Sequence, residues 1–230
     1  MSRILPLIIF ISICSYASGE VQVRFVAIEA KIKEIFYLSS AGEYEELKYA
    51  PYDLSEVLEI KPREGKISLF KKVITEGNVA YQVLAEASVR SMKNALGIIY
   101  SKGNALHLSF YDNSATFFPN SSLRLINLLP VSIYNRVGDR MVEVGPYAVE
   151  VVPIKHKKSR PIVGLISAYK KDSQLKSFFD RRVSVPVTSR LTGVAVTTRG
   201  ALDVVTGGNL EGLNQKLKVD YFLLRDEAEY

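Results

Sequence analysis

The chain has very little cysteine, histidine or tryptophan. Its 230 residues include one cysteine, two histidines and no tryptophan. The single cysteine, Cys14, lies in a terminal apolar segment that we predict to be removed. The remaining chain then has no thiol, which excludes disulfides, thiolate metal sites and a cysteine nucleophile. Its stability has to come from a hydrophobic core, and about 210 residues are enough to bury one.

Sequence motifs that hold metals, phosphates or nucleic acids are also missing. The sequence contains no His-x-x-x-His pair and no calcium-loop pattern of acidic residues. No glycine-rich phosphate loop follows a predicted strand. No nucleic-acid recognition motif is present, although the chain is basic. We therefore expect no cofactor, no metal site and no nucleic-acid partner.

The first nineteen residues have the three parts of a secretory signal peptide. Arg3 gives a basic start, residues 4–13 form an apolar run, and small residues follow up to Gly19. The run is shorter than the ~20 residues that a membrane-spanning helix needs. We predict cleavage near Gly19, so that the mature chain starts near Glu20. An exported chain without cysteine is typical of a bacterial periplasm or cell envelope, where we expect this protein.

The mature sequence has the period-two hydrophobic pattern of β-strands. In residues 79–88, Val79, Tyr81, Val83, Ala85 and Ala87 fall on one face of a predicted strand. Such strands recur every 8–12 residues, which indicates a sandwich or a barrel. We predict an all-β fold, an antiparallel, immunoglobulin-like β-sandwich.

Turn residues separate the predicted strands. Lys102-Gly103-Asn104 and Gly138-Asp139 predict two hairpins, because glycine, asparagine and aspartate tolerate the positive φ of tight turns. Gly207-Gly208-Asn209 predicts a third turn between strands. Residues 172–180 fit either one helical turn or an extended strand, and residues 210–217 fit either a short helix or a loop.

A short internal similarity suggests two β units. Residues 23–26 read Val-Arg-Phe-Val, and residues 123–126 read Leu-Arg-Leu-Ile. Both precede a run of predicted strands, and turn residues lie between them at 112–122. We predict one β unit over residues 20–112 and a second over residues 113–230. The alternatives are one continuous domain and a chance similarity of four strand residues.

Positive charge is concentrated late in the chain. Residues 155–190 hold ten basic and two acidic side chains, whereas residues 20–152 are almost neutral. Such an excess attracts anionic partners wherever it reaches the surface. The alternative is an ordinary solvated surface. The predicted binding residues are Lys155, Lys157, Lys158, Arg160, Lys170, Lys171, Arg181 and Arg182.

Two other groups of residues suggest chemistry more weakly. His107 and Ser109 share a strand face near Asp112, but no nucleophile motif accompanies them, so we assign no catalytic residue. Tyr37, Tyr44 and Tyr52 are candidates for a sugar-binding platform. Packing in the core or at its rim explains these tyrosines equally well.

One stretch of the chain resembles a known group of proteins. The stretch runs from Asp112-Asn113-Ser114 through Phe118–Leu128 to Val137-Gly138-Asp139 and Val144-Gly145-Pro146. It is similar to uncharacterised exported β-sandwich proteins of bacteria over residues 105–155. The resemblance implies an immunoglobulin-like sandwich and an envelope location, and it transfers no activity.

These features favour a non-enzymatic envelope protein that binds, or has a structural role toward, another macromolecule. The partner would be an anionic polymer, a membrane surface or an acidic protein. A carbohydrate- or polymer-binding module is the second hypothesis. A hydrolase with an unrecognised site around His107 is the third. The oligomeric state does not follow from the sequence.

Overall fold

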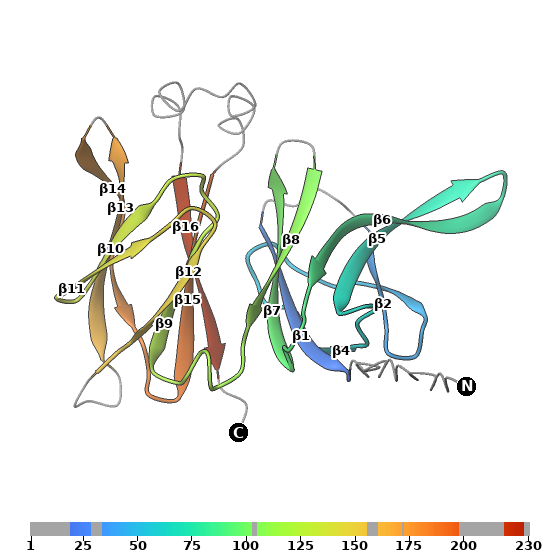
Figure 1. Ribbon diagram of the computed structural model, residues 1–230, viewed down its shortest axis with the longest axis horizontal. Helices are drawn as coiled ribbons and strands as arrows, with labels where there is room; N and C mark the ends of the chain where they lie inside the picture. The colour runs from blue at the N-terminus through green and yellow to red at the C-terminus, as the bar shows by residue number, and fades with distance from the viewer. Residues whose placement is uncertain are drawn as a thin grey trace, which may run out of the picture.

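The fold is all-β, as predicted. The computed structural model describes residues 19–28, 34–102, 105–155, 161–171, 173–197 and 219–227 (Figure 1), and no helix occurs in these ranges. The predicted signal peptide, the Gly207 turn and residues 210–217 lie outside them. The first eight strands are β1 (Val21–Ile28), β2 (Ile35–Leu38), β3 (Tyr44–Glu46), β4 (Leu58–Ile60), β5 (Lys66–Thr75), β6 (Asn78–Ser88), β7 (Asn94–Lys102) and β8 (Ala105–Asp112).

The remaining described strands repeat this arrangement. They are β9 (Ser122–Asn127), β10 (Ile133–Val137), β11 (Arg140–Val144), β12 (Val149–Pro153), β13 (Ile162–Lys171), β14 (Gln174–Ser184), β15 (Ser189–Thr197) and β16 (Val219–Glu227). The first eight strands form the sheets β4-β1-β7-β8 and β3-β2-β5-β6. The last eight form β12-β9-β15-β16 and β11-β10-β13-β14, which is the same order with eight added to each number.

The strand pairing repeats as well. β1 pairs with β7 in parallel, and β9 pairs with β15 in parallel, whereas the other neighbours are antiparallel. The sheets are therefore mostly antiparallel rather than wholly so. The similar segments at residues 23–26 and 123–126 lie in β1 and β9, which hold the same place in the two halves. Whether the halves are separate domains stays a prediction.

The four sheets stack as four layers (Figure 1). One core lies between the two sheets of the first half, around Phe25 and Leu69, and a second lies between those of the second half, around Leu125 and Leu165. A third joins the inner sheets β4-β1-β7-β8 and β12-β9-β15-β16. Its buried members are Val26, Ile28, Leu96, Ile98, Ile126, Leu128, Val194, Val196 and Leu224.

The third core explains the sequences of the central strands. Both faces of the inner sheets are covered, so every residue of β9 and β15 is buried. Strands covered on both faces lose strict alternation and become continuously apolar, as in the Val-Ala-Val segment that ends β15. The two halves thus share buried surface.

Each outer sheet carries a long hairpin with one β-bulge. The register of β5 and β6 shifts between Leu69 and Phe70, which leaves Leu84 as the extra residue. The register of β13 and β14 shifts between Ser167 and Ala168, which leaves Phe178 as the extra residue. A bulge of this kind reverses which face the following side chains occupy.

Both hairpins predicted from turn residues are present in the structure. β7 and β8 form the first predicted hairpin, and β10 and β11 form the second around Gly138, whose φ is 59°. Residues 174–180 are extended in β14, so the helical alternative for them was wrong. Residues 79–88 form a strand, but the single shared face was wrong, because the bulge places Val83 and Ala85 on opposite faces.

Candidate functional site: a buried arginine cluster and an exposed hairpin

A polar cluster interrupts the apolar contact between the inner sheets. Three guanidinium groups enter it, from Arg24 on β1, Arg124 on β9 and Arg190 on β15. Asp226 on β16 and Asn113, which directly follows β8, complete it. Most of these side chains are buried, with Arg124 only 2% exposed and Asp226 7%. The cluster therefore joins the two halves in an environment that is largely closed to water.

Asp226 is the central acceptor of this cluster. Its Oδ1 accepts a hydrogen bond from Nη1 of Arg24 at 3.1 Å. Its Oδ2 accepts one from Nη2 of Arg190 and one from Nδ2 of Asn113, each at 2.8 Å. Short charged hydrogen bonds in buried surroundings are about twice as strong as neutral ones. One carboxylate thus holds β1, β15 and the end of the first half together.

Arg124 contacts no carboxylate among the described residues. Its Nε and Nη2 donate to the hydroxyl of Thr192 at 3.1 and 3.0 Å, and Nη2 also donates to Oδ1 of Asn113. Nη1 donates to the backbone oxygen of Asp112 at 3.1 Å. The guanidinium lies 4.2 Å from the ring centroid of Phe118, a cation–π contact. Burial, followed by the repulsion of Arg190, lowers the pKa of Arg124 to about 9.

The cluster lies where equivalent positions of the two halves meet. Val23 is opposite Ala95 in the β1–β7 pair, as Leu123 is opposite Leu191 in the β9–β15 pair, so Arg24 corresponds to Arg124. By the same alignment Asn113 corresponds to Asp226, and these two side chains are hydrogen-bonded to each other. The cluster therefore has an approximate two-fold symmetry.

A small cavity adjoins the cluster. Its volume is about 10 Å³, close to the space that one water molecule needs. Polar groups of both halves line it, together with three leucines. The lining residues are Arg24, Leu54, Leu96, Asn113, Arg124, Thr192, Leu224 and Asp226. The space is therefore of the size of a single water molecule or monatomic ion.

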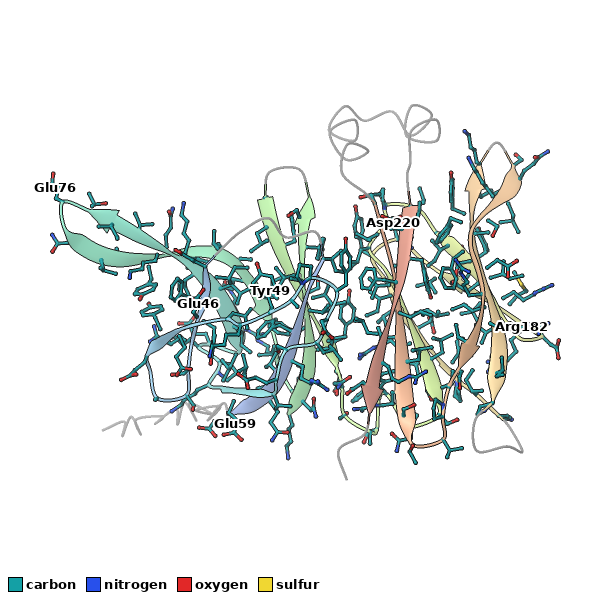
Figure 2. The ribbon with its side chains drawn as sticks, turned by 180° about the vertical axis from the view of Figure 1, so that it is seen from behind. Glu46, Tyr49, Glu59, Glu76, Arg182 and Asp220 are labelled. Carbon is teal, nitrogen blue, oxygen red and sulfur yellow. The ribbon has the colours of Figure 1, made fainter. Side chains whose placement is uncertain are left out.

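The distal part of the β5–β6 hairpin, residues 70–83, is a second notable feature. We call it the β5–β6 arm, and it extends beyond the other strands with Glu76 at its far end (Figures 1 and 2). Its outer face carries Ile74, Val79 and Val83, which are 67%, 54% and 53% exposed. The bulge at Leu84 turns Val79 and Val83 of β6 outward, away from the core that Ala85 faces, and Ile74 of β5 pairs with Val79 on the same face.

The predicted basic binding residues do not gather on one face. Lys157, Lys158 and Arg160 lie outside the described residues, and Lys155 is exposed just after β12. On the β13–β14 hairpin, Lys170 and Arg182 fall on the outer face, whereas Lys171 and Arg181 fall on the opposite one. Figure 2 shows Arg182 at the end of the molecule opposite the β5–β6 arm.

Arg190 departs most from the sequence interpretation. It is one of the ten basic residues of the segment 155–190, for which an anionic partner was predicted. In the structure it is only 9% exposed and contacts Asp226. It therefore contributes to the interface between the halves and not to a cationic surface.

The three candidate platform tyrosines lie in different surroundings. Tyr37 is buried, and its hydroxyl donates to Glu45 at 2.7 Å, while Tyr52 is exposed and packs edge-on against Phe222. Tyr44 is exposed but stacks on Tyr81, with ring centroids 3.9 Å apart. A sugar would find one face of each stacked ring already covered, so the structure does not bring the tyrosines together as a platform.

Asp112 does not join His107 and Ser109 in an arrangement for nucleophilic catalysis. His107 stacks beside Tyr100, with centroids 5.5 Å apart. Asp112 is an odd number of residues away on the same strand, so its side chain projects to the other face from that of His107. Its Oδ1 accepts a hydrogen bond from the backbone N–H of Ser114.

The residues that the structure describes contain no cluster of three or more metal-ligating His, Cys, Asp or Glu side chains. They also contain no helix long and apolar enough to cross a membrane. In comparisons with known proteins, no family model matches this chain and no curated protein is significantly similar to it. The resemblance to exported bacterial proteins stays a prediction.

Proposed function

We propose that this chain is an exported, non-enzymatic protein of the bacterial periplasm or cell envelope that binds another protein through the outer face of the β5–β6 arm. The observation that carries the proposal is the exposed apolar row of Ile74, Val79 and Val83. Exposed contiguous apolar surface on a folded protein usually marks an interaction site. The export part of the proposal rests on the N-terminal sequence pattern.

The residues of the arm favour a protein partner over a polysaccharide. Aliphatic side chains pack against other apolar side chains, whereas sugars prefer free aromatic faces, and the rings of Tyr44 and Tyr81 cover each other. β6 is also the last strand of its sheet, so its outer edge lacks a strand neighbour within that sheet. An extended partner segment can pair with such an edge and bury the neighbouring apolar side chains.

The equivalent hairpin of the second half has a smaller apolar surface, with Leu175, 57% exposed, as the one strongly exposed aliphatic residue among those described beyond its bulge. Beyond its bulge, the first outward pair is Ala168 and Ser177, where the β5–β6 arm has Phe70 and Val83. The apolar row is therefore a property of one hairpin and not of the repeated fold, which supports a specific role for it.

Site-specific photo-crosslinking in the native host tests the proposal. A benzophenone amino acid at Val79 should give one discrete adduct, and the same residue at Ile162 of β13, which is 70% exposed, should not. Replacing Ile74 and Val83 by serine in the Val79-labelled protein should abolish the adduct. Equal labelling from Val79 and Ile162, or an adduct that survives the two serines, would overturn the proposal.

The export part needs its own measurement. N-terminal sequencing of the protein from the envelope fraction should give a chain that starts near Glu20. An uncut chain with Met1 in the cytoplasm would refute export. The carbohydrate or anionic-polymer alternative stays a prediction, and no observation of the structure favours it over protein binding.

A further inference from the structure

The buried cluster has more positive charge than its neighbouring carboxylates balance. Arg24 and Arg190 contact Asp226, whereas Arg124 contacts no carboxylate within the described chain and donates to the amide oxygen of Asn113 instead. Asp112 lies near Arg124, but it contributes its backbone oxygen, and its carboxylate is bonded to Ser114. An unbalanced buried charge is costly, because the low-dielectric surroundings solvate it poorly.

The cluster also has more hydrogen-bond donors than acceptors. A guanidinium carries five N–H groups. Nε of Arg190 is buried without a hydrogen-bond partner in the described chain. The hydroxyl oxygen of Thr192 already accepts from both Nε and Nη2 of Arg124, so its own proton is directed elsewhere. An anion beside Arg24 and Arg124 would relieve the charge excess, while Arg190 does not line the adjoining cavity.

The adjoining cavity offers the place for that anion. Arg24 of the first half and Arg124 of the second line it, as does the hydroxyl-bearing Thr192. Asp226 lines it too, but its two oxygens already accept three hydrogen bonds. With a volume of about 10 Å³, the cavity is close to the size that a single-atom ligand needs.

We propose that this cavity is a chloride site, in which one halide ion lies between Arg24 and Arg124 and offsets part of the excess positive charge at the interface between the halves. A water molecule would accept hydrogen bonds but would leave the charge uncompensated. A chloride ion accepts hydrogen bonds and also offsets one positive charge. Its hydrogen bonds to guanidinium groups are charge-assisted. Chloride would then stabilise the contact between the two halves.

Thermal unfolding of the mature protein tests the proposal. Sodium chloride is exchanged for sodium gluconate at constant ionic strength, so that the chloride concentration changes while the electrostatic screening does not. Above the dissociation constant, each tenfold rise in chloride should raise Tm by roughly 3–5 °C, as mass action on the folded state requires. Equal Tm values in both salts would overturn the proposal.

Variants locate the effect at the cluster. Arg24→Gln removes a guanidinium that is partly exposed and should abolish the chloride dependence of Tm, and Thr192→Val should weaken it. Arg136→Gln, on the exposed side of β10, should leave it unchanged. Chloride dependence that survives Arg24→Gln would place the ion elsewhere and refute the assignment.

A second measurement does not depend on the stability of the variants. Crystals of the unaltered mature protein, soaked in sodium bromide, should show an anomalous scattering peak between Arg24 and Arg124. Bromide peaks on the surface alone, with water in the cavity, would refute the chloride site. This result is independent of the proposed function, because the arm lies in the outer sheet and shares no residue with the cluster.

Discussion

Replacing Asp226 by asparagine should destabilise the whole protein. The substitution keeps the shape of the side chain but removes the one carboxylate that Arg24 and Arg190 contact within the described ranges. It also places an N–H₂ group among donors, so at least one of the three hydrogen bonds to Asp226 is lost. Removing one partner of a buried ion pair typically costs about 3–5 kcal/mol, because the remaining charge stays buried and unpaired.

That cost is large compared with the stability of a typical domain, about 5–15 kcal/mol. For a protein of this length, 1 kcal/mol lowers Tm by roughly 2–4 °C, so we expect a decrease of about 6–20 °C. Urea unfolding followed by circular dichroism would give the same loss of unfolding free energy. It would be seen as a lower midpoint concentration of urea, with an unchanged dependence of the free energy on urea concentration, the slope m. A change in slope would indicate that the two halves no longer unfold together.

A surface ion pair of equal length provides the control. Nζ of Lys66 lies 2.8 Å from Glu86, the same distance as separates Arg190 from Asp226, but both of its side chains are more than 40% exposed. Glu86→Gln should leave the midpoint almost unchanged, because water and salt screen an exposed pair. If Asp226→Asn shifts the midpoint no more than Glu86→Gln does, the argument from burial is wrong.

Two further predictions concern packing and pH. Gly193→Ala would bring a Cβ within 2.6 Å of the Tyr221 ring, so we expect the free energy of unfolding, measured with urea, to fall by about 1–3 kcal/mol. Gly164→Ala has open space around its Cβ and should change that free energy little. Equal effects of the two substitutions would contradict this. Burial and the hydrogen bond to Glu45 raise the pKa of Tyr37 from 10.0 to about 12. The contribution of the neutral Tyr37 hydroxyl to the stability of the protein is therefore fully present below pH 10 and is lost as the pH rises toward 12. Urea unfolding between pH 9 and 12 should show a steeper loss for the unaltered protein than for Tyr37→Phe, and parallel curves would refute this.

The strands and most turns could be predicted from the sequence because both are local properties. Alternation with period two and a glycine of positive φ, such as Gly138, need only a few neighbouring residues. The bulge at Leu84 could not be predicted: Leu84 interrupts the alternation of Val79–Ser88, but so does Ala80, and neither residue alone defines an extra position. The extra residue is defined only by pairing with β5, which is a tertiary contact. For that reason Val79 and Val83, which were predicted to share a face with Ala85, lie in the exposed row of the β5–β6 arm.

The arginine cluster escaped prediction for a different reason. A lone arginine in a strand usually lies on a solvated face. Arg24 and Arg124 lie instead in strands covered on both sides, and that burial depends on the contact between the halves. The sequence did contain a signal, since both arginines occupy the second position of the two similar segments. The similarity of the segments predicts an internal repeat, but it does not predict a buried polar cluster.

The polar centre of the interface also shows why the two halves had to diverge. Across an approximate two-fold axis, equivalent side chains face each other, as Asn113 and Asp226 do at 2.8 Å. Two aspartates at that distance would repel, and two asparagines would leave Arg190 without a carboxylate in contact. One of each gives a donor, an acceptor and a single negative charge. The same asymmetry separates Leu96 from Thr192, which occupy equivalent positions opposite Arg24 and Arg124. Thr192 accepts from Arg124, whereas Arg24 is left to reach Asp226 across the interface. An internal repeat explains the matching strands, and these unlike pairs explain how one carboxylate accepts from side chains of both halves.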